Sequence, residues 1–166
     1  MDSGPFLDLA VAIMDEANAA GSMVIVNDRA DIAVLAKAHG LHVGQDDLSA
    51  SAARRVIGTS AVLGLSTHNQ AQWEAALREP ISYLAIGPVF TTETKATGVA
   101  AVGLATVRRA SDAAAGVGLP VVAIGGITLD RAPEVIASGA ASVAVIGDLL
   151  TSLPELRARA FLRALA

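Results

Sequence analysis

The sequence has no cysteine, few aromatic residues and no excess of positive charge. Without cysteine, neither a disulfide bond nor a thiolate metal site can form, which agrees with a reducing compartment. The 12 basic residues are outnumbered by 16 acidic ones, for a net charge of -4, so we expect neither a nucleic-acid surface nor a polybasic membrane patch. The apolar runs are shorter than the roughly 18 to 20 residues of a membrane span. We therefore expect a soluble, cytoplasmic protein.

Aliphatic residues must build most of the core, because 53% of the residues are hydrophobic and only 3% are aromatic. The length of 166 residues fits one domain, and no linker-like or low-complexity segment divides the chain. We therefore expect residues 1–166 to form a single domain.

Short apolar segments alternate with helix-like stretches along the chain. Six of these segments are nearly continuous in Val, Ile, Leu and Ala, which is typical of parallel strands covered on both faces. The predicted strands are Met23–Val26, Leu41–Gly44, Ala61–Leu65, Tyr83–Val89, Val121–Ile124 and Ser142–Ile146. The predicted helices are Pro5–Ala20, Asp31–His39, Ser49–Val56, Asn69–Arg78, Val102–Ala115, Leu129–Ser138 and a last one from about Leu153. This alternation predicts an α/β fold, either a barrel or an open doubly wound sheet.

Two aspartates follow the first two predicted strands. In α/β folds the chemistry collects beyond the carboxyl ends of the strands, where Asp28 and Asp47 stand one strand–helix unit apart. If the two strands are neighbours, their tips lie about 5 Å apart, so both carboxylates can hold one Mg²⁺ that also binds substrate phosphates. Asp46 can take the place of Asp47, since spacing does not choose between them. The alternative is that each aspartate caps the helix that follows it.

Three later loops have the composition of a phosphate site. The loop after the fourth predicted strand carries Thr92, Thr94 and Lys95, whose hydroxyls and positive charge can hold phosphate oxygens and neutralise a leaving group. Glycine-containing loops at 124–127 and 145–147 follow the last two strands, and their backbone N–H groups can bind a phosphate. The alternatives are a solvated surface loop and tight-turn packing. The two glycine loops together favour phosphate binding.

The three histidines give weaker signals. His42 lies inside a predicted strand and is expected to be a hydrogen-bonded core residue rather than a catalyst. His39 ends a helix, where a cation suits the dipole, and His68 is expected to cap or orient the loop at a strand tip. No histidine is expected to act as a general base, and Ser66 does not lie in the G-x-S-x-G turn of a serine hydrolase.

The motifs at the strand ends resemble those of one known family. They are Val26-Asn27-Asp28-Arg29, His42-Val43-Gly44-Gln45-Asp46-Asp47, Gly64-Leu65-Ser66-Thr67-His68, Ile86-Gly87-Pro88-Val89-Phe90, Thr92-Glu93-Thr94-Lys95 and Ala123-Ile124-Gly125-Gly126-Ile127. From about Val24 to Leu150 the chain resembles the thiamine-phosphate synthases. The resemblance implies a TIM-type (β/α)₈ barrel and a transferase of thiamine biosynthesis. Such an enzyme joins a pyrimidine diphosphate, 4-amino-2-methyl-5-pyrimidinylmethyl diphosphate, to a thiazole phosphate, forming thiamine phosphate and releasing pyrophosphate.

The resemblance also implies a role for individual residues. It places Mg²⁺ on Asp28 and Asp47. It implies contacts to the pyrimidine diphosphate for Asn27, Ser66 and Lys95, and a catalytic role for Ser66 and Lys95. The residues implied to contact the thiazole phosphate are Thr92, Thr94, Gly126, Ile146 and Gly147.

In the implied reaction, departure of pyrophosphate leaves a carbocation-like pyrimidine methylene, which the thiazole nitrogen attacks. Mg²⁺ and Lys95 would stabilise the charge on the leaving group, so no protein nucleophile is needed. Gly147 stands where family members commonly have serine. This departure removes a hydroxyl from the phosphate site and keeps the backbone N–H.

The chain also departs from the family at its beginning. Family members have a strand, a helix and a second strand, which carries a Q-x-R-x-K motif, ahead of the helix that opens this chain. We therefore expect six of the eight barrel strands and seven helices here, in either an N-terminal truncation or a shortened paralogue. The strands at Met23–Val26 and Ser142–Ile146 would then be open edges, which a second copy of the chain could cover.

Two alternative functions follow from the same features. A non-catalytic paralogue could keep the glycine loops and bind a phosphate ligand without turnover. A thiazole tautomerase, the close relative of the synthases, shares the barrel. That enzyme tends to lose the acidic pair, and it typically carries a histidine where Pro88 stands, so the motifs favour the synthase.

Overall fold

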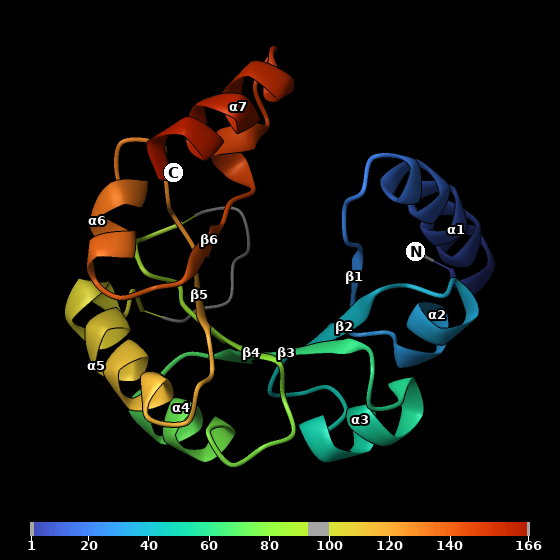
Figure 1. The fold of residues 1–166 in the computed structure, drawn as a ribbon, viewed down its shortest axis with the longest axis horizontal. Coiled ribbons are helices and arrows are strands. Elements are labelled where there is room, and N and C mark those ends of the chain that lie inside the picture. The colour runs from blue at the N-terminus through green and yellow to red at the C-terminus, as the bar shows by residue number, and fades with distance from the viewer. Residues whose placement is uncertain (1, 93–99, 166) are drawn as a thin grey trace. The chain divides into compact units, whose positions relative to one another are not determined.

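A computed structural model describes residues 2–92 and 100–165 of the chain (Figure 1). The chain divides into two compact units. Unit 1 comprises Met1–Ser66 and Arg78–Tyr83, and unit 2 comprises Thr67–Leu77 and Leu84–Ala166. Whether the two units together form the predicted single domain of residues 1–166 stays a prediction.

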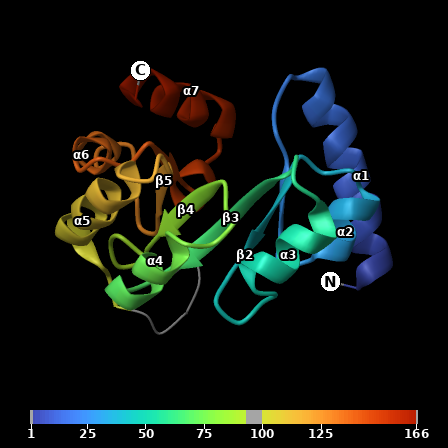
Figure 2. The same ribbon diagram turned by 60° about the horizontal axis from the view of Figure 1, so that its bottom comes forward.

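Unit 1 alternates helices and parallel strands. Its elements are α1 (Ser3–Ala19), β1 (Ile25–Asn27), α2 (Ala30–Leu35), β2 (Gly40–Val43), α3 (Ala50–Ile57) and β3 (Val62–Thr67), whose last residue belongs to unit 2. Strand β2 pairs in parallel with β1 and with β3, and its His42 lies opposite Asn27 on one side and Gly64 on the other. The three helices lie on the same side of these strands (Figures 1 and 2). The neighbouring carboxyl ends of β1 and β2 confirm the condition on which the shared-cation prediction depends.

Unit 2 continues the same alternation. Its elements are α4 (Gln70–Ala76), β4 (Tyr83–Ile86, with Tyr83 in unit 1), α5 (Gly103–Ala115), β5 (Val121–Ile124), α6 (Ala132–Ala137), β6 (Ser142–Ala144), the 3₁₀ helix η1 (Gly147–Leu149) and α7 (Pro154–Leu165). Strand β5 pairs in parallel with β4 and with β6. Helix α5 packs on β5, α6 packs on β6, and α7 contacts α6 and η1. The predicted α/β class, with six parallel strands and seven α-helices in the described residues, is confirmed; closure into a barrel stays a prediction.

Aliphatic side chains build the core, as the composition predicts. Leu41 of β2, Leu63 of β3 and Leu84 and Ile86 of β4 are fully buried. Strands β2, β3 and β4 are buried along most of their length rather than at alternate positions. This pattern agrees with strands covered on both faces, as in parallel sheets.

Several elements are shorter than the apolar runs suggest. The fourth strand ends at Ile86 instead of Val89, because Pro88 has no N–H to continue the ladder. Helix α2 ends at Leu35 instead of His39. There Lys37 adopts a left-handed φ of 54°, and the N–H of Ala38 turns back to the carbonyl oxygen of Ala33, as at many helix ends.

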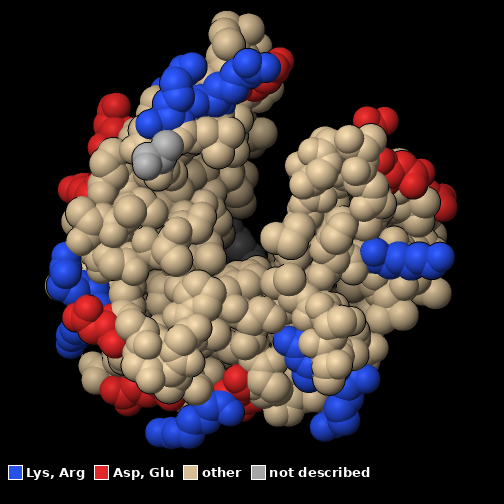
Figure 3. All heavy atoms as spheres, viewed as in Figure 1, with Lys and Arg blue, Asp and Glu red and all other residues tan. Residues whose placement is uncertain are grey.

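Charged side chains are distributed over the outside of the molecule. On the face drawn in Figure 3, basic side chains gather along α7 and acidic side chains stand along α1, and the described part of this face has no broad basic surface. Among residues 2–92 and 100–165, no helix has both the length and the apolar composition needed to cross a membrane.

Candidate functional site

The tip of β1 presents Asn27 and Asp28 to solvent. The N–H of Asp28 donates to the carbonyl oxygen of His42 (2.8 Å) and so extends the pairing with β2. The N–H of Arg29 then donates to the carbonyl oxygen of Asn27 (2.7 Å), which makes the turn at Asp28 very tight. Asp28 has a φ of 65°, a left-handed conformation that Asp tolerates better than most residues. The first residue after β1 is therefore an exposed carboxylate on a strained turn.

Asp47 lies in the loop that follows β2. Its Oδ2 accepts a hydrogen bond from the N–H of Gly44 (2.7 Å), which anchors the carboxylate close to the end of the strand. Helix α3 is capped by Ser49, whose hydroxyl accepts from the N–H of Ala52, and the N-cap of α2 is Arg29. The helix-capping alternative is therefore wrong for Asp47, and the N-cap position of α2 is not Asp28.

Ser66 stands near the end of β3 and is held from two directions. Its Oγ lies 2.8 Å from Nε2 of His42, and its carbonyl oxygen accepts from the side-chain amide of Gln45 (2.6 Å). The other ring nitrogen of His42, Nδ1, lies 2.8 Å from the hydroxyl of Tyr83. The two rings are stacked with centroids 5.6 Å apart. A continuous chain of side chains thus runs from Tyr83 to the predicted catalytic hydroxyl.

Gly64 makes room for this chain. A Cβ atom at Gly64 would lie 2.1 Å from Cζ of Tyr83 and 2.4 Å from Nδ1 of His42, so any larger residue would displace the two rings. Burial raises the pKa of Tyr83 above its ordinary value of 10.0, because desolvation disfavours the phenolate. The tyrosine therefore keeps its proton at neutral pH.

Unit 2 carries the residues predicted to bind a phosphate. Thr92 is half-buried after β4, whereas Thr94 and Lys95 lie outside the described residues. Gly126 has a φ of 65°, and a Cβ atom there would lie 2.6 Å from the carbonyl oxygen of Thr91. Glycine is therefore required where the loop after β5 packs against the segment that leads to Thr92.

Arg131 lies over this glycine loop. Its Nη1 donates to the carbonyl oxygen of Gly126 (3.1 Å), and its guanidinium lies 4.6 Å from the centre of the Phe90 ring. Such stacking holds the cation over the aromatic face. Arg131 thus places a positive charge beside Gly126.

The loop after β6 is held by a charged pair. Ile146 and Gly147 are exposed, and the adjacent Asp148 accepts from both the guanidinium of Arg157 (2.7 and 2.8 Å) and the N–H of Leu129 (2.8 Å). Partial burial acts to raise the pKa of Asp148, but the hydrogen bonds from Arg157 and Leu129 and the charge of Arg157 outweigh it, so the pKa lies below its ordinary value. Asp148 thereby connects η1 to α7 and to the start of the α6 segment.

The structure brings the predicted residues together within each unit. In unit 1, Asn27, Asp28, Asp47 and Ser66 lie at the carboxyl ends of three adjacent strands. His42 is hydrogen-bonded to two of them, to Oγ of Ser66 through its ring and to the N–H of Asp28 through its carbonyl oxygen. In unit 2, Thr92, Gly126, Ile146 and Gly147 follow β4, β5 and β6. The described residues contain no group of three or more His, Asp or Glu side chains arranged for a metal ion.

Sequence reasoning missed the bridging role of His42 and the participation of Tyr83. His42 is hydrogen-bonded inside a strand, as predicted, but its two partners extend the site along the sheet. The available signal was the interruption of aliphatic strands by polar residues at His42, Ser66 and Tyr83. Arg131 and Asp148 were not assigned a role because each resembles an ordinary surface charge in the sequence.

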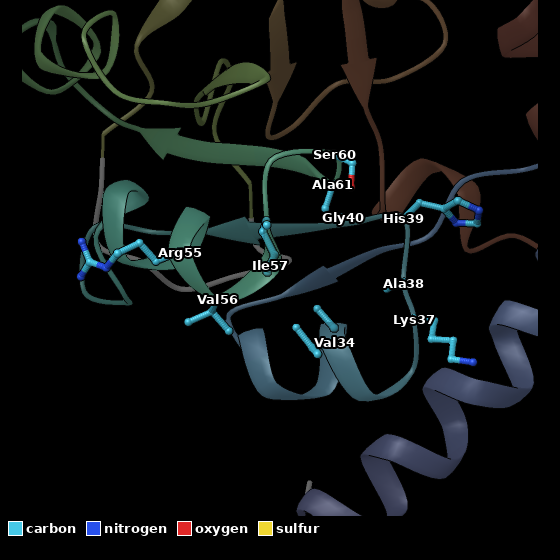
Figure 4. A pocket seen from close by; sticks show the side chains of 12 residues that line it. Val34, Lys37, Ala38, His39, Gly40, Arg55, Val56, Ile57, Ser60 and Ala61 are labelled. Carbon is cyan, nitrogen blue, oxygen red and sulfur yellow. The ribbon is translucent and has the colours of Figure 1, made fainter.

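A surface pocket lies away from these residues. Its volume is about 590 Å³, and it is lined by α2, α3 and the amino ends of β2 and β3. Figure 4 shows apolar side chains such as Val34 and Ile57 at its wall, with Lys37 and Arg55 pointing away from each other. Ligand sites normally have convergent polar groups, which this pocket lacks among its described lining residues. It is distinct from the carboxyl ends of the strands.

Comparison with known proteins decides the family. The family described as thiamine monophosphate synthase matches residues 1–149 of the chain. The chain belongs to this family. Thiamine-phosphate synthases from two bacteria are close in sequence: that of Koribacter versatilis is 47% identical over 142 residues and that of Mycolicibacterium smegmatis 46% over 140 residues.

The matches cover most of this chain and less of its relatives. The two synthases are matched over 86% and 84% of this chain, but over only 65% and 60% of their own lengths. The chain thus spans less than two thirds of the length of these relatives. Among solved structures, a thiamine phosphate pyrophosphorylase from Pyrococcus furiosus superposes with a TM-score of 0.83 at 26% identity, over 100% of this chain and 80% of the other. This likeness agrees with the membership of the thiamine monophosphate synthase family.

Proposed function

We propose that the protein is a transferase that joins the pyrimidine diphosphate to the thiazole phosphate, forming thiamine phosphate and releasing pyrophosphate. The observation that carries this proposal is the set of polar residues at the ends of β1, β2 and β3. Asn27, Asp28, Asp47 and Ser66 stand there, in sequence motifs that resemble those of the family. Two synthases of more than 45% identity support it. A TIM-type barrel in the whole protein and a cytoplasmic location are part of the same proposal.

The residues at the tips of β1 and β2 fit a magnesium ion. Mg²⁺ in proteins is usually held by one or two carboxylates together with water and substrate phosphates. Asp28 and Asp47 supply two carboxylates at neighbouring strand ends, and the hydrogen bond from the N–H of Gly44 to Oδ2 of Asp47 holds one of them close to the end of β2. We propose that these two residues hold Mg²⁺, which would supply positive charge to the departing diphosphate.

Positioning and charge neutralisation account for the proposed chemistry. Asn27 and Ser66 would orient the pyrimidine diphosphate, and Lys95 would neutralise its leaving group. No side chain needs to act as a nucleophile or a general base in this reaction. This agrees with the structural role of two histidines. Nδ1 of His68 lies 2.6 Å from the carbonyl oxygen of Gly87, and Nδ1 of His39 accepts from the N–H of Val24.

The loops of unit 2 would bind the thiazole phosphate. Thr92 and Thr94 would contribute hydroxyls, and Gly126, Ile146 and Gly147 would contribute backbone N–H groups. The left-handed backbone at Gly126 and the anchored Asp148 next to Gly147 support this assignment. Oxygen atoms of phosphate are well bound by such exposed N–H groups.

The test measures pyrophosphate release from both substrates in the presence of Mg²⁺. Asp28→Asn and Asp47→Asn each replace a proposed metal ligand by a neutral side chain of the same shape, and each should lower the rate at least about 100-fold. Asp46→Asn is the matched control because Asp46 is an equally exposed neighbour, and it should keep the wild-type rate. Folding of every variant is checked by circular dichroism.

Three outcomes contradict parts of this proposal. No pyrophosphate release from well-folded protein overturns catalysis by this chain, and binding of the thiazole phosphate without turnover would then favour the phosphate-binding alternative. Isomerisation of the thiazole without a pyrimidine substrate would identify a tautomerase. A strong loss in Asp46→Asn with little loss in Asp47→Asn would move the metal site to Asp46.

The open strand edges also predict a homo-oligomer. A measurement of the molar mass of the protein in solution tests this prediction.

A further inference from the structure

Three side chains of unit 1 form one hydrogen-bonded chain that ends at Ser66. The hydroxyl of Tyr83 lies 2.8 Å from Nδ1 of His42, and Nε2 of His42 lies 2.8 Å from Oγ of Ser66. The three residues come from β4, β2 and β3. Neighbouring Gly64 leaves the space that both rings occupy. The geometry therefore couples a half-buried tyrosine to a hydroxyl at the proposed substrate site.

The direction of the hydrogen bonds follows from the chemistry of the phenol. Within the described residues, the hydroxyl of Tyr83 has His42 as its hydrogen-bond partner. If this hydroxyl only accepted a hydrogen bond from His42, its own proton would have no partner there. Leaving the proton of this half-buried phenol without a partner is unfavourable, because an unpaired donor costs up to about 1 to 3 kcal/mol when it is withdrawn from water. The phenol therefore donates to Nδ1 of His42.

This direction determines the proton on the imidazole. A neutral imidazole that accepts at Nδ1 carries its proton on Nε2, and that N–H donates to Oγ of Ser66. With its oxygen already accepting from the imidazole, Ser66 keeps its own O–H for another partner. The hydroxyl proton of Ser66 is then directed to whatever acceptor binds at the strand end.

We propose that Tyr83 and His42 are positioning residues that hold Ser66 as a hydrogen-bond donor to an acceptor atom of the pyrimidine diphosphate. The identity of this ligand rests on the proposed function. The chain of hydrogen bonds does not, since it is a property of unit 1 alone. The two parts can therefore fail separately, and two experiments distinguish them.

The first experiment observes the histidine protons directly by ¹⁵N NMR at a pH where the rings are neutral. The other two histidines supply references for both tautomers. His39 accepts from a backbone N–H at Nδ1 and must carry its proton on Nε2, whereas His68 places Nδ1 2.6 Å from a carbonyl oxygen and must carry its proton there. We expect the signals of His42 to match those of His39. Signals like those of His68 would overturn the proposed direction.

The variant Tyr83→Phe removes the donor and keeps the ring. Nδ1 of His42 then has no phenol proton to accept, so the His68-like tautomer should become populated and Ser66 should turn its proton towards Nε2. His39→Gln is the matched control, because His39 precedes β2 at the opposite end of the strand, and it should leave the His42 signals unchanged. An unchanged tautomer in Tyr83→Phe would overturn the role of Tyr83.

The second experiment measures kcat and KM in a double-mutant cycle. Tyr83→Phe should lower kcat about tenfold, the effect of one misdirected hydrogen bond, with a small change in KM for the thiazole phosphate. In the Ser66→Ala background the same change should have no effect on kcat, because Tyr83 acts through Ser66. If Tyr83→Phe lowered kcat by the same factor in the wild-type and the Ser66→Ala backgrounds, the role of Tyr83 would be structural and would not act through Ser66. If no variant or wild-type protein turns over, the proposed function fails while NMR still decides the hydrogen-bond chain.

Discussion

At the scale of single residues, Asp28 combines an exposed carboxylate with an unfavourable backbone. Its φ of 65° is rare for a residue with a side chain, and such conformations cost of order 1 kcal/mol or more unless the surroundings impose them. Here the hydrogen bond to His42 and the tight turn to Arg29 hold the backbone in place. The position of the carboxylate is thus maintained at a cost in stability.

Substitutions at Asp28 should separate stability from function. Asp28→Gly should raise the free energy of unfolding by up to about 1 kcal/mol, because glycine adopts this φ without strain. Asp28→Ala should lower it by about 1 kcal/mol, and Asp28→Asn should leave it nearly unchanged since Asn tolerates the left-handed region. Urea denaturation measures stability and calorimetry measures Mg²⁺ binding, which all three variants should lose. A stabilised Asp28→Ala variant would contradict the strain argument.

At the scale of elements, one ion pair connects α7 to the rest of unit 2. The side chain of Arg157 is 32% exposed and that of Asp148 is 18% exposed, and the carboxylate of Asp148 also accepts from the N–H of Leu129. By contrast, Arg159 and Glu155 form a pair within α7 that is 65% and 77% exposed. Partly buried, multiply bonded pairs contribute more than exposed ones, which are screened by solvent.

These two arginines of α7 provide a matched comparison. Arg157→Met should lower the free energy of unfolding by about 1 to 2 kcal/mol, because it leaves Asp148 without its charged donor. Arg159→Met should change it by less than about 0.5 kcal/mol. Thermal unfolding monitored by circular dichroism measures both, with roughly 2 to 4 °C expected per kcal/mol at this size. Equal losses in both variants would show that the contact with Asp148 has no special weight.

At the scale of the whole molecule, shifted pKa values predict how stability depends on pH. On the acid side, the pKa of Asp148 is lowered in the folded state, so its contribution is present above the ordinary value of 3.8 and is lost as pH falls through the folded pKa. The pKa of Asp31 is lowered to about 2 by its hydrogen bond with Arg29, but both side chains are exposed and solvent screening weakens this pair.

The alkaline side depends on Tyr83, the sole tyrosine of the sequence. Its pKa is raised in the folded state by burial, so the stabilising effect is present below pH 10 and is lost as the pH rises through the folded pKa. We therefore expect maximal stability between about pH 5 and pH 8, measured by urea denaturation across pH. Arg157→Met should flatten the acid limb, and Tyr83→Phe should flatten the alkaline limb. An alkaline limb unchanged by Tyr83→Phe would contradict the assignment.

The sequence alone determined the α/β class and the placement of polar residues after the strands. Both depend on local information. Buried parallel strands require continuous apolar runs, and the residues that directly follow a strand in the sequence lie at its carboxyl end. Asp28 could be named for this reason, together with either Asp46 or Asp47, whereas the choice of Asp47 and the role of Ser66 came from the family resemblance. The ends of α2 and β4 were less predictable, since they depend on the backbone at Lys37 and Pro88.

Only the tertiary structure decided how those residues are held. Tyr83 contacts His42 across 41 positions of sequence and His42 contacts Ser66 across 24, so their bonds depend on strand register and on the space left by Gly64. The carboxylate of Asp47 accepts from the N–H of Gly44, and the side chain of Ser49 caps α3. Composition excluded cysteine chemistry, but hydrogen bonds between distant residues require a three-dimensional arrangement that no one-dimensional pattern contains.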